Sequence, residues 1–307
     1  MIDNANLREA QAFVEYLAVA RGASPNTVAA YGRDVREYLR FLGKDAAAAG
    51  QGDIEKWLGF LAKKDNGARS SARKLSAVRK FYNFLQERGW AKDDPTEGVP
   101  LPKLPQTLPK ALSMDEVKKL LLAPLGTAAV EVRLRLIIQL LYATGLRVSE
   151  LCGLSLDAVA EGEGVVLRVT GKGGKTRLVP LGEVAAGTMH TYLKEARPRL
   201  KGANGPWVFA GPNGHAPLTR VRVFQLLKEA GERVGVHVAP HHLRHTFATH
   251  LLANDADLRA VQLMLGHASL NTTQIYTKVA GERLRETLEK HHPLNVGRKG
   301  AKRSTAE

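Results

Sequence analysis

The chain has 307 residues, of which 44% are hydrophobic, so it is long enough for two domains with ordinary cores. Its 45 lysines and arginines exceed its 30 aspartates and glutamates, and the net charge of +15 predicts a polyanionic partner, either nucleic acid or an anionic membrane. No apolar run approaches the roughly 18 residues of a transmembrane helix, no signal-peptide pattern opens the chain, and a single cysteine excludes an internal disulfide. These features favour a soluble intracellular protein, and the missing GxxxxGKS/T loop argues against an ATP-driven motor.

The positive charge is spread along the chain and not collected in one segment. Residues 1–110 carry 18 basic and 13 acidic side chains, and residues 111–307 carry 27 and 17. Membrane-binding segments usually concentrate their charge on one helix or tail, whereas two separately basic domains suit an extended polyanion. The pattern therefore favours nucleic acid, and we expect no membrane insertion.

A proline-rich stretch, residues 91–110, divides the chain. It holds five of the 14 prolines, and proline fixes φ and removes a backbone donor, so we expect an extended linker here. The linker separates a first domain, residues 1–90, from a second, residues 111–293. The remaining residues, 294–307, are polar and basic without periodicity, which predicts a disordered tail.

The first domain is predicted to be entirely helical. Ser24 followed by Pro25 is typical of a helix N-terminus, and apolar residues then recur at helical spacing as far as Leu42. Asp53 is expected to cap a short helix, and a longer helix is expected over residues 68–87.

One face of the helix at residues 68–87 is basic. Acidic residues are absent from 66 to 86, so ion pairs within the helix cannot neutralise these cations. A solvated helix face is the simpler interpretation, but the missing acidic residues favour contact with phosphate. Ser76 also lies on this face, and Arg79 flanks it. The DNA-binding residues predicted here are Arg69, Arg73, Lys74 and Lys80.

The second domain is predicted to be mainly helical with a small antiparallel sheet. A capping box that starts at Ser113 opens its first helix, and a Leu- and Ile-rich core helix over residues 130–142 ends before Gly145. Two strands, 165–170 and 176–181, flank a glycine-rich turn and predict a hairpin. Further helices are expected over residues 219–232, 241–252, 257–264, 270–278 and 281–290.

Six residues of the second domain carry groups suited to phosphate chemistry, although each alone is a weak signal. Each has a simpler explanation: Arg147 could form a surface salt bridge with a nearby carboxylate, and Lys172 could be a solvated hairpin lysine. His241 and Arg244 could form an ordinary basic helix face, and Tyr276 could be a half-buried helix tyrosine. A metal site at His241 and His245 is disfavoured, because HHLRH lacks the glutamate of HExxH and Arg244 would repel a cation. His242, His245, His250 and Cys152 are explained most simply as structural or surface residues. The six candidates are Arg147, Lys172, His241, Arg244, His267 and Tyr276.

Taken in order, these six residues and their surroundings resemble the tyrosine recombinase (phage integrase) family. Within it they resemble the Xer subfamily, which has XerC-like and XerD-like branches, and the XerD-like branch in particular. The resemblance covers nearly the whole chain, and all six family positions are matched. It rests on SSARKLSAVRKFYNFL in the first domain and on ATGLRVSEL, GKGGKTRLVPL, PHHLRHTFATHLL, LGHASLNTTQIYTKV and ERLRETLEKHHP in the second. The implied fold is a helical core-binding domain followed by an α+β catalytic domain, and the tail beyond Pro293 is longer than the family pattern.

A phosphodiester must gain negative charge in the transition state, and without a metal or another cofactor the protein has to supply fixed cations. The resemblance implies that Arg147 and Arg244 bind the phosphate and that Tyr276 attacks it to form a 3′-phosphotyrosyl intermediate. Because this ester conserves the bond energy, rejoining needs no ATP. The other implied roles are general base for His241, general acid for Lys172, a hydrogen bond to a non-bridging oxygen for His267 and orientation of the site for Glu150.

The resemblance further implies a protein that clamps double-stranded DNA between its domains and acts as a homo- or hetero-tetramer on paired sites, through a Holliday junction. The amphipathic helix around Leu284 and Leu288 resembles the segment that this family docks into a neighbouring protomer. The expected role is resolution of chromosome dimers in the bacterial cytoplasm, at the nucleoid, with a septum-located DNA translocase as a partner. Further DNA contacts are expected from Lys175, Arg220 and Arg222.

Three other functions share parts of this pattern. A mobile-element integrase would often carry an extra arm-binding domain, for which a first helix starting near residue 5 leaves no room. A non-catalytic DNA-binding protein would not need all six residues, and a type IB topoisomerase would not need the terminal helix. The combination favours a recombinase.

Overall fold

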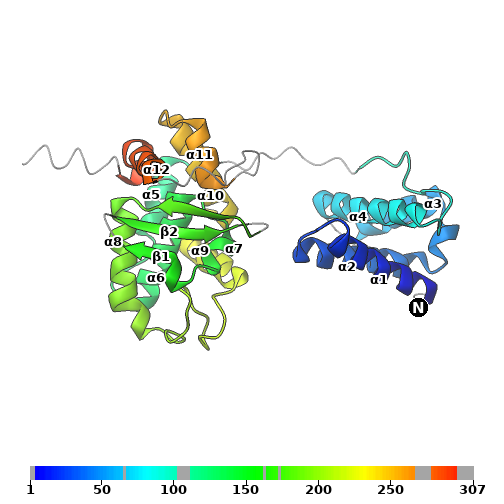
Figure 1. Cartoon of the computed structure of the whole chain (residues 1–307), viewed down its shortest axis with the longest axis horizontal. Helices are drawn as coiled ribbons and strands as arrows, with labels where there is room; N and C mark the ends of the chain where they lie inside the picture. The colour runs from blue at the N-terminus through cyan, green and yellow to red at the C-terminus, as the bar shows by residue number, and fades with distance from the viewer. Residues whose placement is uncertain are drawn as a thin grey trace, which may run out of the picture. The chain divides into compact units, whose positions relative to one another are not determined.

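The chain divides into two units, Met1–Thr107 and Leu108–Glu307, in the computed structural model (Figure 1). The structure describes residues 4–64, 67–101, 111–161, 164–171, 174–266 and 278–295. The division falls inside the proline-rich segment 91–110. No helix in the described ranges is long and apolar enough to span a bilayer.

The first unit is helical, as predicted. Its helices are α1 (Asn4–Val19), α2 (Pro25–Leu42), α3 (Gln51–Lys63) and α4 (Ala68–Glu87), with a short 3₁₀ helix at Ala46–Ala48. The Ser24 hydroxyl accepts the Thr27 N–H at 3.2 Å and Pro25 takes the first helical position, which confirms the predicted start of α2. The predicted cap at Asp53 is wrong, because α3 begins two residues earlier; the Asp53 carboxylate instead accepts the Gly50 N–H at 3.0 Å from the third helical position.

Aromatic rings fill the core of the first unit. The ring of Tyr38 lies 5.0 Å from that of Trp57, and its hydroxyl lies 2.8 Å from the hydroxyl of Tyr82, so these buried polar groups are satisfied by each other. The face of α4 that packs into this core includes the buried residues Leu75, Val78, Tyr82 and Leu85.

The first part of the segment predicted to be a linker packs against the first unit. Ala91 and Val99 belong to its hydrophobic core. The Arg79 guanidinium donates to the carbonyl oxygens of Thr96 at 3.3 Å and Val99 at 2.8 Å. Prolines in the segment remove backbone donors but leave every carbonyl able to accept, so the chain can still be fastened here. The core packing of the first unit therefore extends to Val99, and residues 102–110 lie outside the described residues.

The second unit is mainly helical with a small antiparallel sheet, which confirms the predicted fold class (Figure 1). The short helices α7 and α8 and the three-residue strand β1 have no counterpart in the prediction, and most of the helix predicted over 270–278 lies outside the described residues. The helices are α5 (Met114–Leu122), α6 (Ala129–Thr144), α7 (Val148–Cys152), α8 (Glu183–Thr191), α9 (Arg220–Val234), α10 (Pro240–Ala253), α11 (Leu258–Leu265) and α12 (Lys278–His291), and the strands are β1 (Val159–Glu161), β2 (Val165–Thr170) and β3 (Thr176–Pro180).

The strands pair in the order β1-β2-β3, with Leu167 opposite Val179 and Val169 opposite Arg177. Leu167, Val169 and Val179 are buried, as the alternation of a half-buried strand requires. Arg177 is also on the buried face of β3, whereas its neighbour Leu178 is 39% exposed. An arginine thus occupies a position at which the pattern would place an apolar side chain.

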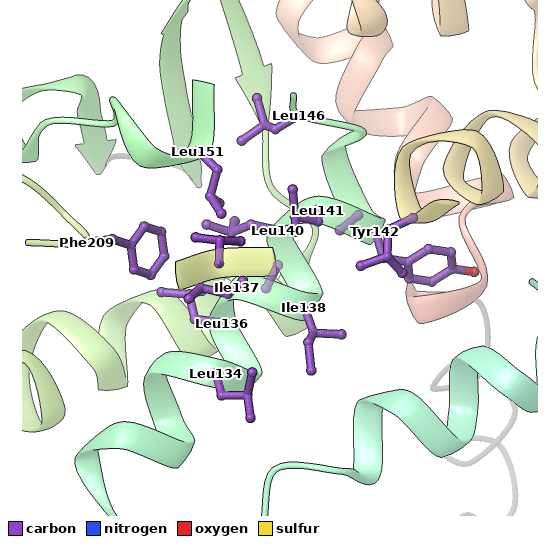
Figure 2. Packing of buried hydrophobic residues seen from close by; sticks show 14 of the residues in the cluster. Leu134, Leu136, Ile137, Ile138, Leu140, Leu141, Tyr142, Leu146, Leu151 and Phe209 are labelled. Atoms are coloured by element: carbon purple, nitrogen blue, oxygen red, sulfur yellow. The ribbon is translucent and has the colours of Figure 1, made fainter. Parts of the chain in front are cut away.

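Helix α6 runs through the core of the second unit and is buried almost all round from Leu134 to Thr144 (Figure 2). It ends at Gly145, whose φ of 61° lies in the left-handed region that favours glycine. A Cβ at this position would lie 2.5 Å from the Phe247 ring, so both the backbone conformation and the packing require glycine. This fixed helix end determines where the chain leads on to Arg147.

The last described helix, α12, packs on its own unit. Leu284 and Leu288 are 8% and 1% exposed and form a cluster with side chains of α10 and α11. The fully buried His292 follows, with Nε2 3.1 Å from the Tyr142 carbonyl oxygen. The two leucines expected to dock into a neighbouring protomer are therefore covered within this chain. Packing continues to Asn295, two residues beyond the predicted end of the domain, because its side chain donates to the Leu288 carbonyl at 3.1 Å.

Candidate active site

The site is built around Glu150, in the first turn of α7. The Glu150 carboxylate accepts hydrogen bonds from the Arg147 backbone N–H and from Arg147 Nη1, both at 2.8 Å. The backbone bond closes the N-terminus of α7, so the local fold and the orientation of the Arg147 side chain depend on the same carboxylate. The side chain of Arg147 remains 39% exposed, whereas that of Glu150 is 3% exposed.

A second arginine, Arg177 of β3, completes the partners of Glu150. Its Nη1 and Nη2 donate to the two carboxylate oxygens at 2.8 and 2.9 Å, and its Nε donates to the Met264 carbonyl oxygen at 2.9 Å. Burial raises the pKa of the Glu150 carboxyl, but the hydrogen bonds from Arg177 and from the Arg147 backbone outweigh burial and lower this pKa to about 2. Glu150 therefore stays ionised throughout the physiological range.

Arg244 reaches the same place from α10. It donates to the carbonyl oxygens of Gly145 and, at 2.7 Å, Leu265, which close α6 and α11 respectively. Burial and then repulsion from Arg147 lower the pKa of Arg244 to about 10, so it remains a cation at neutral pH. We call Arg147, Glu150, Arg177 and Arg244 the Glu150 cluster; three guanidiniums and one carboxylate give it a net charge of +2.

His241 lies one helical turn before Arg244, in the first turn of α10. Its side chain is exposed, and its ring centroid lies 4.2 Å from that of His242. His242 is half-buried, and burial followed by repulsion from His241 lowers the pKa of His242. Within the described ranges no three His, Cys, Asp or Glu side chains gather as a metal site would require.

Three of the six candidates, Lys172, His267 and Tyr276, lie outside the described residues. The structure does fix the elements beside two of them. The Gly171 N–H donates to the Lys175 carbonyl at 2.8 Å and closes the base of the β2–β3 hairpin, and Gly266 ends α11 in the left-handed conformation. Lys175 itself is exposed.

Helix α9 presents the other predicted DNA-binding residues of the second unit. Arg220 is exposed at its first turn, and α9 packs against α7. Arg222 is already paired within the helix, with Glu229 at 2.9 Å and Gln225 at 3.3 Å. Arg220 is therefore the freer of the two cations to meet a phosphate.

The basic face of α4 differs from its prediction. The carboxylate partners that α4 lacks come from α2: Lys74 is buried and pairs with Glu37 at 2.7 Å, and Arg73 pairs with the buried Asp34. The absence of acidic residues from α4 therefore does not leave these two cations unpaired, because their carboxylate partners lie on a different helix. Two cations of this face, Arg69 and Lys80, have no carboxylate partner among the described residues, and Lys80 lies 5.3 Å over the Tyr31 ring.

Arg177 is the residue that the motif-based prediction missed. Its alternation with Val179 along the strand was a usable signal, since both residues must point to the same face. A buried arginine needs hydrogen-bond or ionic partners, and a buried carboxylate such as that of Glu150 can satisfy it.

Two family models match the chain. The model of the phage integrase family matches residues 110–283, and that of the phage integrase N-terminal SAM-like domain matches residues 10–89. The tyrosine recombinase XerD of Caulobacter vibrioides is 44% identical over 300 residues, covering 94% of this chain and 97% of its own, and XerD of Rhizobium meliloti is 44% identical over 299 residues, covering 92% and 94%. A solved structure of the XerH site-specific recombinase, bound to a palindromic difH substrate in a post-cleavage complex, has a TM-score of 0.65 at 23% identity and covers 91% of this chain and 84% of its own.

Proposed function

Because this chain belongs to the phage integrase family and is a tyrosine recombinase, we propose that its second unit cuts and rejoins DNA with Tyr276 while Arg147 and Arg244 hold the scissile phosphate. The observation that carries this assignment is the Glu150 cluster. Two arginines from different helices are fixed beside one buried carboxylate and still leave a net positive charge. A site of this kind binds an anion without a metal.

The two arginines supply the charge that the transition state needs. The phosphoryl oxygens gain negative charge as Tyr276 attacks, and guanidiniums that are already oriented stabilise that charge without reorganising. Arg244 is held by backbone carbonyls and Arg147 by Glu150, so both are fixed before the DNA arrives. An arginine of this kind contributes about 10³–10⁵ in rate.

The proton transfers fall to three residues with different roles. A tyrosine hydroxyl ordinarily has a pKa of about 10, so Tyr276 needs a proton acceptor, which is His241. Lys172 donates a proton to the leaving 5′-hydroxyl, and His267 binds a non-bridging oxygen. The resulting 3′-phosphotyrosyl ester stores the energy of the broken bond, so the same site rejoins strands through a Holliday junction without ATP.

On DNA, this chain acts as a homo- or hetero-tetramer on paired recombination sites. Recombinases of this fold have been solved on DNA, among them the XerH complex and a lambda integrase tetramer bound to a Holliday junction. In this protein Arg69 and Lys80 of the first unit and Lys175 and Arg220 of the second are exposed cations suited to the phosphate backbone.

The biological role is resolution of chromosome dimers at the nucleoid, in the cytoplasm and with a septum-located DNA translocase as a partner. Similarity to XerD over nearly the full length of both chains supports this role over that of a mobile-element integrase.

The test is Tyr276→Phe on a suicide substrate nicked beside the scissile phosphate. The unaltered protein should form a covalent 3′-phosphotyrosyl adduct in EDTA, and Tyr276→Phe should bind the same DNA without forming it. Tyr142→Phe is the matched control, because Tyr142 is a buried tyrosine of the same unit that bonds His250 and should leave the adduct intact. An adduct that persists in Tyr276→Phe, or one that needs magnesium, would contradict the assignment.

A further inference from the structure

Arg177 contacts three segments of the second unit, two of which are distant from it in sequence. It reaches α7 through both oxygens of Glu150 and the end of α11 through the Met264 carbonyl. It also packs against Gly171, at the base of its own hairpin, and against Gly266, which ends α11. A Cβ at Gly266 would lie 3.2 Å from Arg177 Nη1, and one at Gly171 would lie 3.5 Å from the same atom.

Each of these three segments leads to a residue of the proposed mechanism. Glu150 holds Arg147, Gly171 precedes Lys172 in the chain, and Gly266 precedes His267. Arg177 is buried, with a side chain 5% exposed, so it has no access to DNA and cannot bind the phosphate itself. Any effect it has on the reaction must act through these neighbours.

The hydrogen-bond geometry at Glu150 shows what Arg177 prevents. Glu150 Oε1 accepts from Arg147 Nη1 and Arg177 Nη1, and Oε2 accepts from the Arg147 backbone N–H and Arg177 Nη2. The guanidinium of Arg147 therefore donates one N–H to Glu150, whereas that of Arg177 donates two, from Nη1 and Nη2. An unpaired buried charge is costly. If Arg177 were removed, we expect the guanidinium of Arg147 to rotate and donate to both oxygens of the buried carboxylate through its two-nitrogen fork.

We infer that Arg177 is a positioning residue, which occupies the Glu150 carboxylate so that the remaining N–H groups of Arg147 stay free for the phosphate. This inference rests on the proposed function, since it assumes that Arg147 binds the scissile phosphate. The two arginines that bond Glu150 thus have different tasks. Arg177 satisfies the carboxylate, and Arg147 keeps its positive charge directed outward.

The variant Arg177→Met should slow single-turnover adduct formation by about 10²-fold, the size of effect that a misplaced reactive group produces. DNA affinity should stay within about twofold, because Arg177 is buried away from DNA. Arg177→Lys keeps the charge but loses the fork, and should slow the reaction by about tenfold. Arg197→Met is the matched control, because Arg197 is a buried arginine of the same unit that bonds the backbone carbonyls of Ala203, Gly205 and Trp207 and should cleave at the normal rate.

The double variant Arg177→Met/Glu150→Gln separates positioning from a purely structural role. A neutral amide no longer competes for the Arg147 fork, so the double variant should cleave at least about fivefold faster than Arg177→Met, a coupling of the size that contacting residues show. Rates should be compared at saturating DNA, at a temperature where circular dichroism shows every variant folded. If Arg177→Met does not fold, Arg177→Lys carries the measurement.

Two results would overturn the inference. One is an Arg177→Met or Arg177→Lys protein that cleaves at the normal rate, and the other is a double variant slower than Arg177→Met. Both presuppose that the unaltered protein forms the adduct; absence of that adduct would instead overturn the proposed function.

Discussion

In the first unit each described ion pair of α4 joins one cation to its own carboxylate, whereas in the second unit Arg147 and Arg177 share Glu150 and Arg244 is held by backbone carbonyls. In the first arrangement each cation is neutralised by a carboxylate of the protein itself. The second leaves three guanidiniums against one carboxylate and so keeps positive charge for a ligand. A count of basic residues along the chain does not distinguish these two cases, because the distinction depends on which helices lie opposite.

The largest expected contrast is between Arg244→Ala and Arg79→Ala. Loss of Arg244 removes a cation from the developing charge and should slow adduct formation by about 10³–10⁵, with little change in DNA affinity. Loss of Arg79 removes bonds to Thr96 and Val99 and should change the cleavage rate by less than about threefold, within the range of substitutions away from a site. Single-turnover assays measure both, and an Arg79→Ala protein as slow as Arg244→Ala would end the distinction between the two regions.

Acid should weaken the second unit before the first. Burial lowers the pKa of His292 to about 4 from an ordinary 6.5, so the folded state binds fewer protons and the contribution of this residue is complete above pH 6.5 and is lost as the pH falls toward 4. The loss is on the order of 3 kcal/mol. In the first unit burial raises the pKa of Asp34 despite its pairing with Arg73, which gives the opposite sign: its contribution grows as the pH falls.

Calorimetry of the full chain between pH 7.5 and 4.5 tests this difference. The unfolding of the second unit should shift to lower temperature in acid, and His292→Phe, which keeps a ring against Tyr142 and Phe247, should lose most of that pH dependence. An equally steep pH dependence in His292→Phe would show that other groups cause the acid response.

A smaller effect is expected where α4 is paired with α2. Arg73→Ala leaves the buried Asp34 without its ionic partner and should lower the free energy of unfolding by about 1–3 kcal/mol. Arg73→Ala/Asp34→Asn should recover part of that loss, since a neutral amide is less costly to bury than a carboxylate. Urea denaturation measures both variants. Arg73→Ala with unchanged stability would mean that the ion pair between α2 and α4 contributes nothing.

The smallest effect on folding, and a clear effect on binding, is expected for Arg69→Ala/Lys80→Ala. These exposed side chains should contribute less than about 0.5 kcal/mol to stability. If both contact phosphates, the slope of log affinity against log salt should flatten by about 1–2. Lys56→Ala/Lys63→Ala on α3 is the matched control, with the same charge change off the basic face. An unaltered slope in the α4 variant would leave this face as a solvated helix surface.

Local signals predicted much of the fold. Ser24-Pro25 and the capping box at Ser113 mark helix starts through contacts within four residues, and both are found as expected. Gly145 ends α6 for a reason that is half local, its left-handed φ, and half tertiary, the Phe247 ring beside it. The helix α8 has no clear apolar stripe in EVAAGTMHT, so periodicity could not reveal it.

The candidate site was predicted less completely than the fold. The motifs ATGLRVSEL and PHHLRHTFATHLL contain Arg147, Glu150 and Arg244, but of the contacts of these residues only the Arg147–Glu150 pair lies within a few residues in sequence. Arg177 and the partners of Arg73 and Lys74 were missed because each pair joins segments that only the tertiary fold brings together. Sequence patterns report which residue types are present, whereas charge balance depends on contacts between distant elements.

The hydrogen bonds of Arg244 also bear on which heritable changes the site can tolerate. Both of its recorded acceptors are backbone carbonyls, and every amino acid at positions 145 and 265 would supply one. Arg147, in contrast, is held by the side chain of Glu150. A mutation in the codon for residue 150 can therefore displace Arg147 even when the codon for Arg147 is unchanged. Of the two positions whose carbonyls accept from Arg244, Gly145 tolerates few substitutions, because a side chain there would clash with Phe247 and Leu265. The two arginines proposed to bind the phosphate therefore differ in how many substitutions can displace them, and variants of this chain should lose the placement of Arg147 by more routes than that of Arg244.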